Sequence, residues 1–131
     1  MSDHRCEAAI LVVEDDVAIR ESIAEALEDN EFLSIEVGNG QEALARLRAG
    51  PTKPCVILLD IMMPEMDGWQ FRALQRQDPT LSSIPVVVIT AHVNIAEVEK
   101  GMAPDACLSK PIQLANLVAI VERFCRRTSE P

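Results

Sequence analysis

The segment from Cys55 to Gly68 constrains the fold more than any other part of the chain. Its first five residues, C-V-I-L-L, are apolar without alternation. This is typical of a strand buried on both faces of a parallel sheet, although a buried helix would show the same run. The run stops at Asp60, and Pro64, Asp67 and Gly68 follow as a loop signature. An aspartate that only ends a strand would fit equally well, so the other carboxylates must decide what Asp60 does.

Five short apolar runs alternate with five amphipathic segments along the chain. The runs span residues 8–13, 32–37, 55–60, 84–90 and 106–109, and the segments with helical spacing span 17–29, 39–50, 69–77, 94–102 and 113–126. Asp16 is a candidate N-cap, and Asn39 with Glu42 has the spacing of a capping box. The alternation predicts an α/β fold with a parallel sheet, helices on both faces and right-handed crossovers.

Length and charge exclude several classes of protein. A chain of 131 residues fits one domain, which we expect at residues 8–127 with flexible ends at 1–7 and 128–131. The formal net charge of −9 argues against unaided binding of nucleic acid, because phosphate contacts need clustered Lys or Arg. No secretory signal is visible, and no apolar run approaches the roughly 20 residues of a membrane span. We therefore expect a cytoplasmic protein that does not bind membranes.

The four cysteines, Cys6, Cys55, Cys107 and Cys125, are far apart and include no C-x-x-C pair. Three of them fall inside apolar patterns. This predicts reduced, small core residues of a cytosolic protein and gives no reason to expect a zinc site.

Polar side chains follow four of the five predicted strands, where the strands end. These residues are Glu14, Asp15, Asp16, Asp60, Thr90 and Lys110. In a parallel sheet they would gather at one edge, and clustered carboxylates need a cation to stay ionised. Mg²⁺ suits such a site because it prefers hard oxygen ligands and accepts two carboxylates plus water. A carboxylate beside it can attack a phosphoryl donor, while a hydroxyl and a lysine bind the phosphoryl oxygens.

Four motifs in this order, V-V-E-D-D, L-L-D-I-M-M-P-E-M-D-G, V-I-T-A and L-S-K-P, carry a family resemblance. The sequence resembles the receiver domain of bacterial two-component response regulators over nearly its whole length. The resemblance implies a flavodoxin-like (βα)5 three-layer sandwich with sheet order 2-1-3-4-5. It also implies a phosphoacceptor for a sensor histidine kinase or a phosphotransfer protein, rather than an enzyme.

The same resemblance implies a role for each residue of the metal site. Asp60 would accept the phosphoryl group, and Asp15 would bind Mg²⁺ directly with Glu14 assisting through water. The carboxylate of Asp60 and the backbone carbonyl of Met62 would complete the protein ligands. Asp16 is better explained as a helix cap than as a metal ligand, and Asp67 is better explained as a residue that shapes the loop or caps the next helix.

For the phosphoryl group, the resemblance implies that Thr90 donates a hydrogen bond and Lys110 forms an ion pair. The Lys110–Pro111 peptide bond is expected to be cis. Phosphorylation would then shift a docking face for an unidentified downstream partner, and the 94–126 face could support a homodimer.

Two positions depart from the family pattern. Cys107 stands where an aromatic residue usually couples to the threonine, so we expect a muted switch, or one that runs through the loop after Thr90. Met62 stands where many relatives carry a polar side chain that orients the hydrolytic water. We therefore expect a long-lived phosphoaspartate, with His92 as a further residue beside the mouth of the site.

Two other functions remain open from the sequence. A Mg²⁺-dependent phosphohydrolase of the haloacid dehalogenase type would need a second aspartate at the position of Met62. A receiver-like interaction module that never takes phosphate would not need the complete set of acids, hydroxyl and lysine. No helix-turn-helix follows the last predicted helix, so either a stand-alone regulator or a domain of a larger regulator or hybrid kinase fits.

Overall fold

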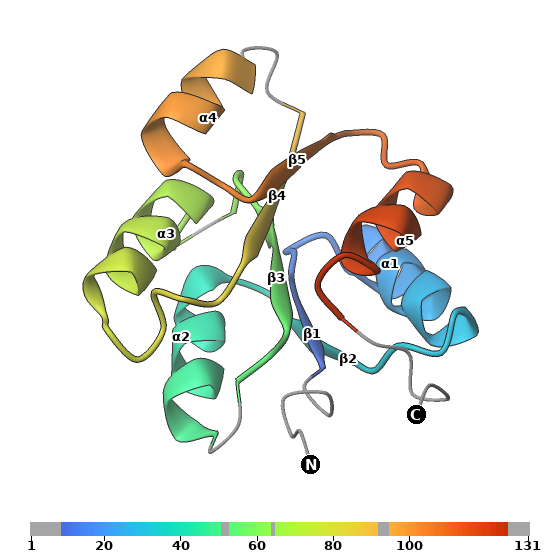
Figure 1. Cartoon of the computed structure of the whole chain (residues 1–131), viewed down its shortest axis with the longest axis horizontal. Helices are drawn as coiled ribbons and strands as arrows, with labels where there is room; N and C mark the ends of the chain where they lie inside the picture. Colours follow the sequence, from blue (N-terminus) through green and yellow to red (C-terminus); the bar gives the residue numbers. More distant parts are fainter. Residues whose placement is uncertain (1–8, 51–52, 64, 92–94, 126–131) are drawn as a thin grey trace.

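The computed structural model describes residues 9–50, 53–63, 65–91 and 95–125. Within these ranges one parallel sheet has the order β2-β1-β3-β4-β5 (Figure 1). The strands are β1 (Ile10–Val13), β2 (Ser34–Val37), β3 (Val56–Asp60), β4 (Val86–Thr90) and β5 (Ala106–Ser109). The helices are α1 (Val17–Asp29), α2 (Gly40–Ala49), α3 (Gly68–Gln77), α4 (Ile95–Met102) and α5 (Leu114–Val121). This is the predicted flavodoxin-like arrangement.

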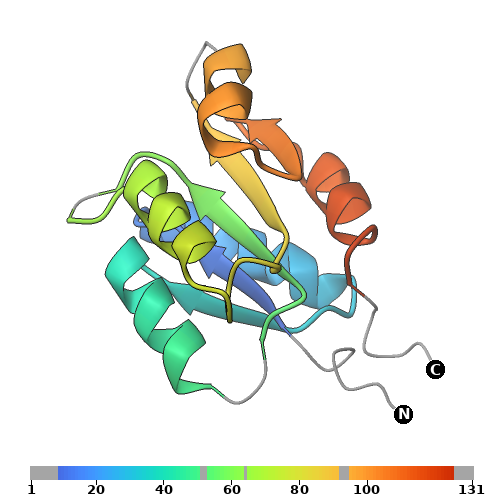
Figure 2. The same ribbon diagram turned by 60° about the vertical axis from the view of Figure 1, so that its left-hand side comes forward.

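Helices cover both faces of the sheet, as Figures 1 and 2 show. Helices α1 and α5 pack on one face, and α2, α3 and α4 lie on the other. Each face has its own apolar cluster, the first centred on Ile23, Leu58 and Leu117, and the second on Leu44, Leu59 and Phe71. The central strand β3 contributes to both clusters and all five of its residues are buried. Its apolar run without alternation is therefore explained by burial on both sides.

The strand register brings the polar strand ends to one edge of the sheet. Val13, the last residue of β1, pairs with Leu59 of β3, and Asp60 pairs with Ile89 of β4. Thr90 in turn pairs with Ser109 at the end of β5. The residues that follow β1 and β5 thus start beside the carboxyl ends of β3 and β4.

Side-chain caps fix where α1 and α3 begin. Asp16 accepts a hydrogen bond from the backbone N–H of Ile19 at 3.0 Å. Asp67 accepts from the N–H of Gln70 at 2.9 Å, and the side chain of Gln70 accepts from the N–H of Asp67 at 3.0 Å, which completes a capping box. Both aspartates therefore cap helices, as the sequence predicted.

The cap of α2 differs in one respect from the prediction. Asn39 accepts from the N–H of Glu42 at 2.9 Å, as expected. The Glu42 carboxylate, however, accepts from the N–H of Gly38 at 2.8 Å. The reciprocal bond of the capping box is therefore displaced by one residue.

The second and fourth strands each begin two residues later than predicted. The N–H of Phe32 donates to Leu27 O at 2.9 Å in the turn after α1, so β2 begins only at Ser34. The fourth strand begins at Val86, because Ile84 donates to Leu81 O in a turn and Pro85 has no N–H.

The last helix was predicted to reach residue 126, and this was wrong. It ends at Val121. Beyond it Arg123 and Phe124 donate to carbonyls three residues earlier, at 3.0 Å each, which tightens the chain into a turn.

The prediction of reduced cysteines was also wrong for one pair. Cys55 and Cys125 form a disulfide across 70 residues of sequence, with their Cα atoms 5.5 Å apart. The fold brings together two thiols whose spacing in the sequence carries no signal. Cys107 is free and half-buried, and Cys6 lies outside the described residues.

No helix among the described residues has the length and apolar character needed to cross a membrane.

Candidate functional site

Three carboxylates gather where β1 and β3 end. Glu14, Asp15 and Asp60 each offer an oxygen, and these oxygens lie within 4.8 Å of one another. Glu14 and Asp60 are each only 1% exposed, whereas Asp15 is exposed. The cluster forms because β1 and β3 are neighbours in the sheet, although 45 residues separate the first and last acid in the sequence.

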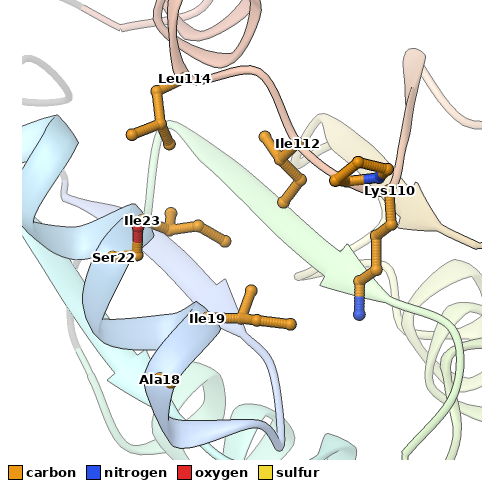
Figure 3. A pocket seen from close by; sticks show the side chains of 8 residues that line it. Ala18, Ile19, Ser22, Ile23, Lys110, Ile112 and Leu114 are labelled. Carbon is orange, nitrogen blue, oxygen red and sulfur yellow. The ribbon is translucent and has the colours of Figure 1, made fainter.

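Lys110 reaches this cluster from beyond β5, at the far edge of the sheet. Its Nζ lies 3.2 Å from Glu14 Oε1 and 3.3 Å from Asp60 Oδ1. Its backbone N–H donates to Thr90 O at 2.9 Å, which fixes the start of its side chain beside β4. The Lys110–Pro111 peptide bond is cis, as expected. Figure 3 shows the lysine side chain directed toward the carboxyl end of β3.

The pKa values of both Asp60 and Lys110 are raised in the site. Burial raises the pKa of Asp60 from 3.8 to about 7; Glu14 adds to the rise, and Lys110 opposes it. Burial would lower the pKa of Lys110, but the charges of Asp60 and Glu14 outweigh it and the pKa is raised. One ammonium therefore does not balance the buried carboxylates, and the site favours additional positive charge.

The donor set fits a hard divalent cation. Asp60 Oδ1 accepts from the N–H of Met62 at 3.3 Å and faces Lys110. The other oxygen, Oδ2, is buried and has no hydrogen-bond donor within the described part of the chain. A buried carboxylate oxygen without a donor is costly unless a cation or water binds it. Carboxylate oxygens on neighbouring strand ends are ligands that Mg²⁺ accepts.

Thr90 ends β4 one residue beyond the partner of Asp60, and it is fully buried. The structure therefore places this hydroxyl-bearing residue on the strand adjacent to β3, at the same edge as Asp60.

The loop after Asp60 passes close to the start of α3. The N–H of Gly68 donates to Ile61 O at 2.9 Å. A Cβ at Gly68 would lie 2.8 Å from Ile61 Cα and 2.9 Å from Asp60 O, so only glycine allows this approach. Met62, in the same loop, is 69% exposed.

Arg20 is a site residue that the sequence did not reveal. Its Nη1 donates to Glu14 O at 2.9 Å, and its Nε lies 3.4 Å from Glu36 Oε1 of β2. The arginine thereby holds the chain at the end of β1. In the sequence it is one polar residue of an amphipathic helix, and nothing distinguishes it from its neighbours.

Two positions from the sequence prediction stand apart from the cluster. Cys107 lies in β5 and packs against the apolar cluster that includes Val98 and Met102 of α4. Burial, with a smaller contribution from Glu99, raises the pKa of its thiol. His92 lies outside the described residues.

A cleft of about 330 Å³ opens beside Lys110, between α1 and the chain that leads into α5. Figure 3 shows Ile19 and Ile23 of α1 facing Ile112 and Leu114 across it. The cleft is largely apolar, with the ammonium-bearing side chain at one end.

The geometry agrees with a comparison of the sequence with protein families. The profile named "Response regulator receiver domain" matches residues 10–122. The chain belongs to this family. It is thus a receiver domain of the kind found in two-component response regulators.

Similar full-length proteins and solved structures agree. The chain is 35% identical over 122 residues to response regulator Rre1 of Synechocystis sp., covering 91% of this chain and 52% of that protein. It is 36% identical over 122 residues to response regulator MprA of Mycobacterium leprae, covering 91% of this chain and 51% of that protein. The receiver domain therefore spans about half the length of these curated relatives.

Among solved structures, the signal receiver domain of a histidine kinase from Syntrophus aciditrophicus superposes with a TM-score of 0.80. It has 29% identity, and the match covers 95% of this chain and 97% of that one. The phosphorylated cyanobacterial phytochrome response regulator RcpA superposes with a TM-score of 0.74. Its identity is 33%, over 88% of this chain and 89% of that one.

Proposed function

We propose that this receiver domain accepts a phosphoryl group on Asp60 from a histidine kinase or a phosphotransfer protein, with Mg²⁺ as the cofactor. The observation that carries the proposal is the buried Oδ2 of Asp60. It has no hydrogen-bond donor among the described residues, while Glu14, Asp15 and Lys110 lie around the same carboxylate. A purely structural aspartate would have its buried oxygens satisfied.

In the proposed step, a carboxylate oxygen of Asp60 attacks the phosphorus of the donor, and the bond from phosphorus to the donor's imidazole nitrogen breaks. The phosphoryl group gains contact with Lys110, whose ammonium then pairs with a phosphoryl oxygen instead of the unmodified carboxylate. The hydroxyl of Thr90 donates to another phosphoryl oxygen. Mg²⁺, when bound, neutralises negative charge on the carboxylates and the transferred group.

The proposed Mg²⁺ ligands are the carboxylates of Asp15 and Asp60 and the backbone carbonyl of Met62, with Glu14 acting through water. The proximity of the three acids supports this assignment. The raised pKa of Asp60 supports it as well, because a nearby cation would restore the ionised form that attacks phosphorus.

The phosphoryl donor docks, in this proposal, in the cleft between α1 and the chain before α5. The cleft is apolar and has Lys110 at its edge (Figure 3). Because Lys110 Nζ lies 3.3 Å from Asp60 Oδ1, a helix seated in the cleft would present a histidine close to Asp60. Ala18 and Ser22 lie on its exposed rim.

The output of the domain is proposed to be small in amplitude, since Cys107 is packed against the apolar cluster on this face of the sheet and lacks a ring that could change position. Phosphorylation then acts on an unidentified protein partner through the loop after β4 and through α4. Any catalytic activity is limited to slow self-dephosphorylation, and the setting is the cytoplasm, where sensor kinases would phosphorylate Asp60.

Acetyl phosphate with Mg²⁺, followed by intact mass measurement, tests the phosphoacceptor. We expect one stable phosphoryl adduct on the wild type and none on Asp60→Asn. Continuous release of phosphate with no adduct would instead indicate a phosphohydrolase. Unchanged mass in the folded wild type would indicate a module that takes no phosphate.

The docking cleft has a separate test. Ala18→Arg should slow transfer from a phosphorylated kinase or phosphotransfer protein by at least about tenfold and leave labelling by acetyl phosphate unchanged. Ala45→Arg, the same change on the exposed side of α2, is the matched control. Equal transfer rates in both variants would refute docking at this cleft while leaving the role of Asp60 intact.

A further inference from the structure

The disulfide between Cys55 and Cys125 joins two elements at the end of the sheet opposite the acidic site. Cys55 directly precedes β3, and Cys125 follows the turn after α5. Five residues of extended chain, roughly 17 Å, separate Cys55 from Asp60. Forming or breaking the disulfide therefore affects the chain at the end of α5, and the carboxylates of the acidic site lie too far away to be contacted. In Figure 1 the red segment after α5 turns back toward the sheet.

The two cysteines are held in different ways. The N–H of Cys55 donates to Ala9 O at 3.2 Å, so the sheet positions this residue whatever the state of its sulfur. The N–H of Cys125 donates to Val121 O, four residues earlier in the same segment, at 2.9 Å. Both side chains are partly buried against the cluster of α1 and α5. Breaking the disulfide would therefore free the Cys125 side of the pair.

Helix α5 is short and has few capping contacts from side chains. It is eight residues long, Gln113 provides no side-chain cap bond, and its last turn contains no basic residue. Its C-cap residue is the acidic Glu122, at the negative end of the helix dipole, where basic residues are the more favourable choice. A helix this short is marginal without tertiary contacts. The disulfide adds a covalent contact just beyond the C-terminal end of this short helix, where the N–H of Glu122 donates to Val118 O.

We propose that Cys55 and Cys125 form a reversible redox latch, which fixes the end of α5 to the sheet when oxidised and releases it when reduced. The oxidant is a low-molecular-weight disulfide such as oxidised glutathione. The thiolate of one cysteine attacks a glutathione sulfur and expels one glutathione thiolate; the second cysteine then attacks the protein sulfur of the mixed disulfide and expels the other. The protein loses two protons and two electrons, and the two electrons reduce the glutathione disulfide to two thiols.

This latch regulates α5 independently of phosphoryl transfer; it rests on the cytoplasmic setting proposed above but not on the role proposed for Asp60. Disulfides in reducing compartments are mostly transient or redox-sensing. Both cysteine residues are partly exposed rather than buried, which favours access by small thiols over a bond between fully buried residues. Cys107 is free, half-buried and on a different strand, which makes it the natural control.

Hydrogen exchange on the full chain tests the latch. The protein is equilibrated with oxidised or reduced glutathione, and exchange is followed by mass spectrometry in residues 122–125 and, as a reference, in β3. We expect the oxidised protein to be two hydrogen atoms lighter. Its amides at 122–125 should exchange on the order of tenfold more slowly, while β3 should stay unchanged.

Two variants separate the latch from a general effect of buffer. Cys125→Ser should exchange like the reduced protein in both buffers, and Cys107→Ser should respond like the wild type. Equal exchange at 122–125 in the two redox states of the wild type would overturn the proposal, whether or not a variant folds. A bond that millimolar reduced glutathione leaves intact in the folded protein would also overturn it, because the crosslink would then be permanent.

Discussion

Replacing Asp60 by asparagine should stabilise the metal-free protein, although it removes the residue proposed to carry the phosphoryl group. The side chain is 1% exposed, and burial together with Glu14 raises its pKa from 3.8 to about 7. A shift of about 3 pKa units means that the free energy of unfolding is about 4 kcal/mol lower with Asp60 ionised than with Asp60 protonated. Asparagine keeps the shape and removes the charge, so it avoids most of this cost.

The sign of the pH dependence follows from the raised pKa. The folded state holds the proton of Asp60 more tightly than the unfolded state does, so stability is full below about pH 4 and falls as pH rises through about 7. Asp60→Asn removes this group from the titration. The free energy of unfolding of the variant should equal that of the wild type at about pH 4 and exceed it by about 4 kcal/mol above about pH 8.

Urea unfolding in the presence of a chelator, repeated across this pH range, measures the difference. Glu21→Gln, which removes an exposed carboxylate from α1, is the matched control and should show no comparable pH-dependent gain. Adding Mg²⁺ should reduce this difference in stability, because the cation stabilises the wild type and binds more weakly to the variant, whose site has one ligand fewer. An Asp60→Asn protein that is no more stable than the wild type at about pH 8 would refute the electrostatic account of the site.

Three further changes test other parts of the structure. Under oxidising conditions Cys125→Ser should be about 4 kcal/mol less stable than the wild type, which is the loop-closure value for a loop of about 70 residues. This difference should vanish when the Cys55–Cys125 disulfide of the wild type is reduced, and urea unfolding with and without reductant measures it. Gly101→Ala should lower the stability by about 1–3 kcal/mol through overpacking, because the new Cβ would lie 2.6 Å from Trp69 Cζ3. A thermal melt measures the decrease, and an unchanged melting temperature would contradict the close packing of α3 on α4. Asp67→Ala should lower the stability by about 1 kcal/mol because the α3 cap is lost, while Asp67→Asn should keep most of the stabilisation that the cap gives. Equal unfolding midpoints for the two variants would contradict the role of Asp67 as a cap.

The elements of the fold could be predicted because their signals are local. The run before Asp60 shows burial on both faces, and Asp16 and Asp67 mark helix starts through bonds that span only three residues. The end of the last helix could not be predicted in this way. Its apolar spacing continues to Phe124, but the chain tightens after Val121 and Cys125 is bound to Cys55 on the sheet.

The acidic edge of the sheet was predictable in outline because parallel strands end on the same side. Their order in space, which puts β1 beside β3, came from the family resemblance and not from the residues alone. The distances that matter chemically, such as 3.3 Å between Lys110 Nζ and Asp60 Oδ1, depend on the register of four strands and were beyond prediction.

By itself the sequence determined the alternation of strands and helices, the polar residues that end the strands, and the family to which they point, because each is written in short stretches of neighbouring residues. Only the tertiary structure decided the Cys55–Cys125 bond and the bonds from buried Arg72 to Met102 O and Ala103 O, at 2.8 and 2.7 Å. These contacts join residues about 30 and 70 positions apart, and no local preference of the chain selects one distant partner over another. Their pairing follows from how the helices pack on the sheet.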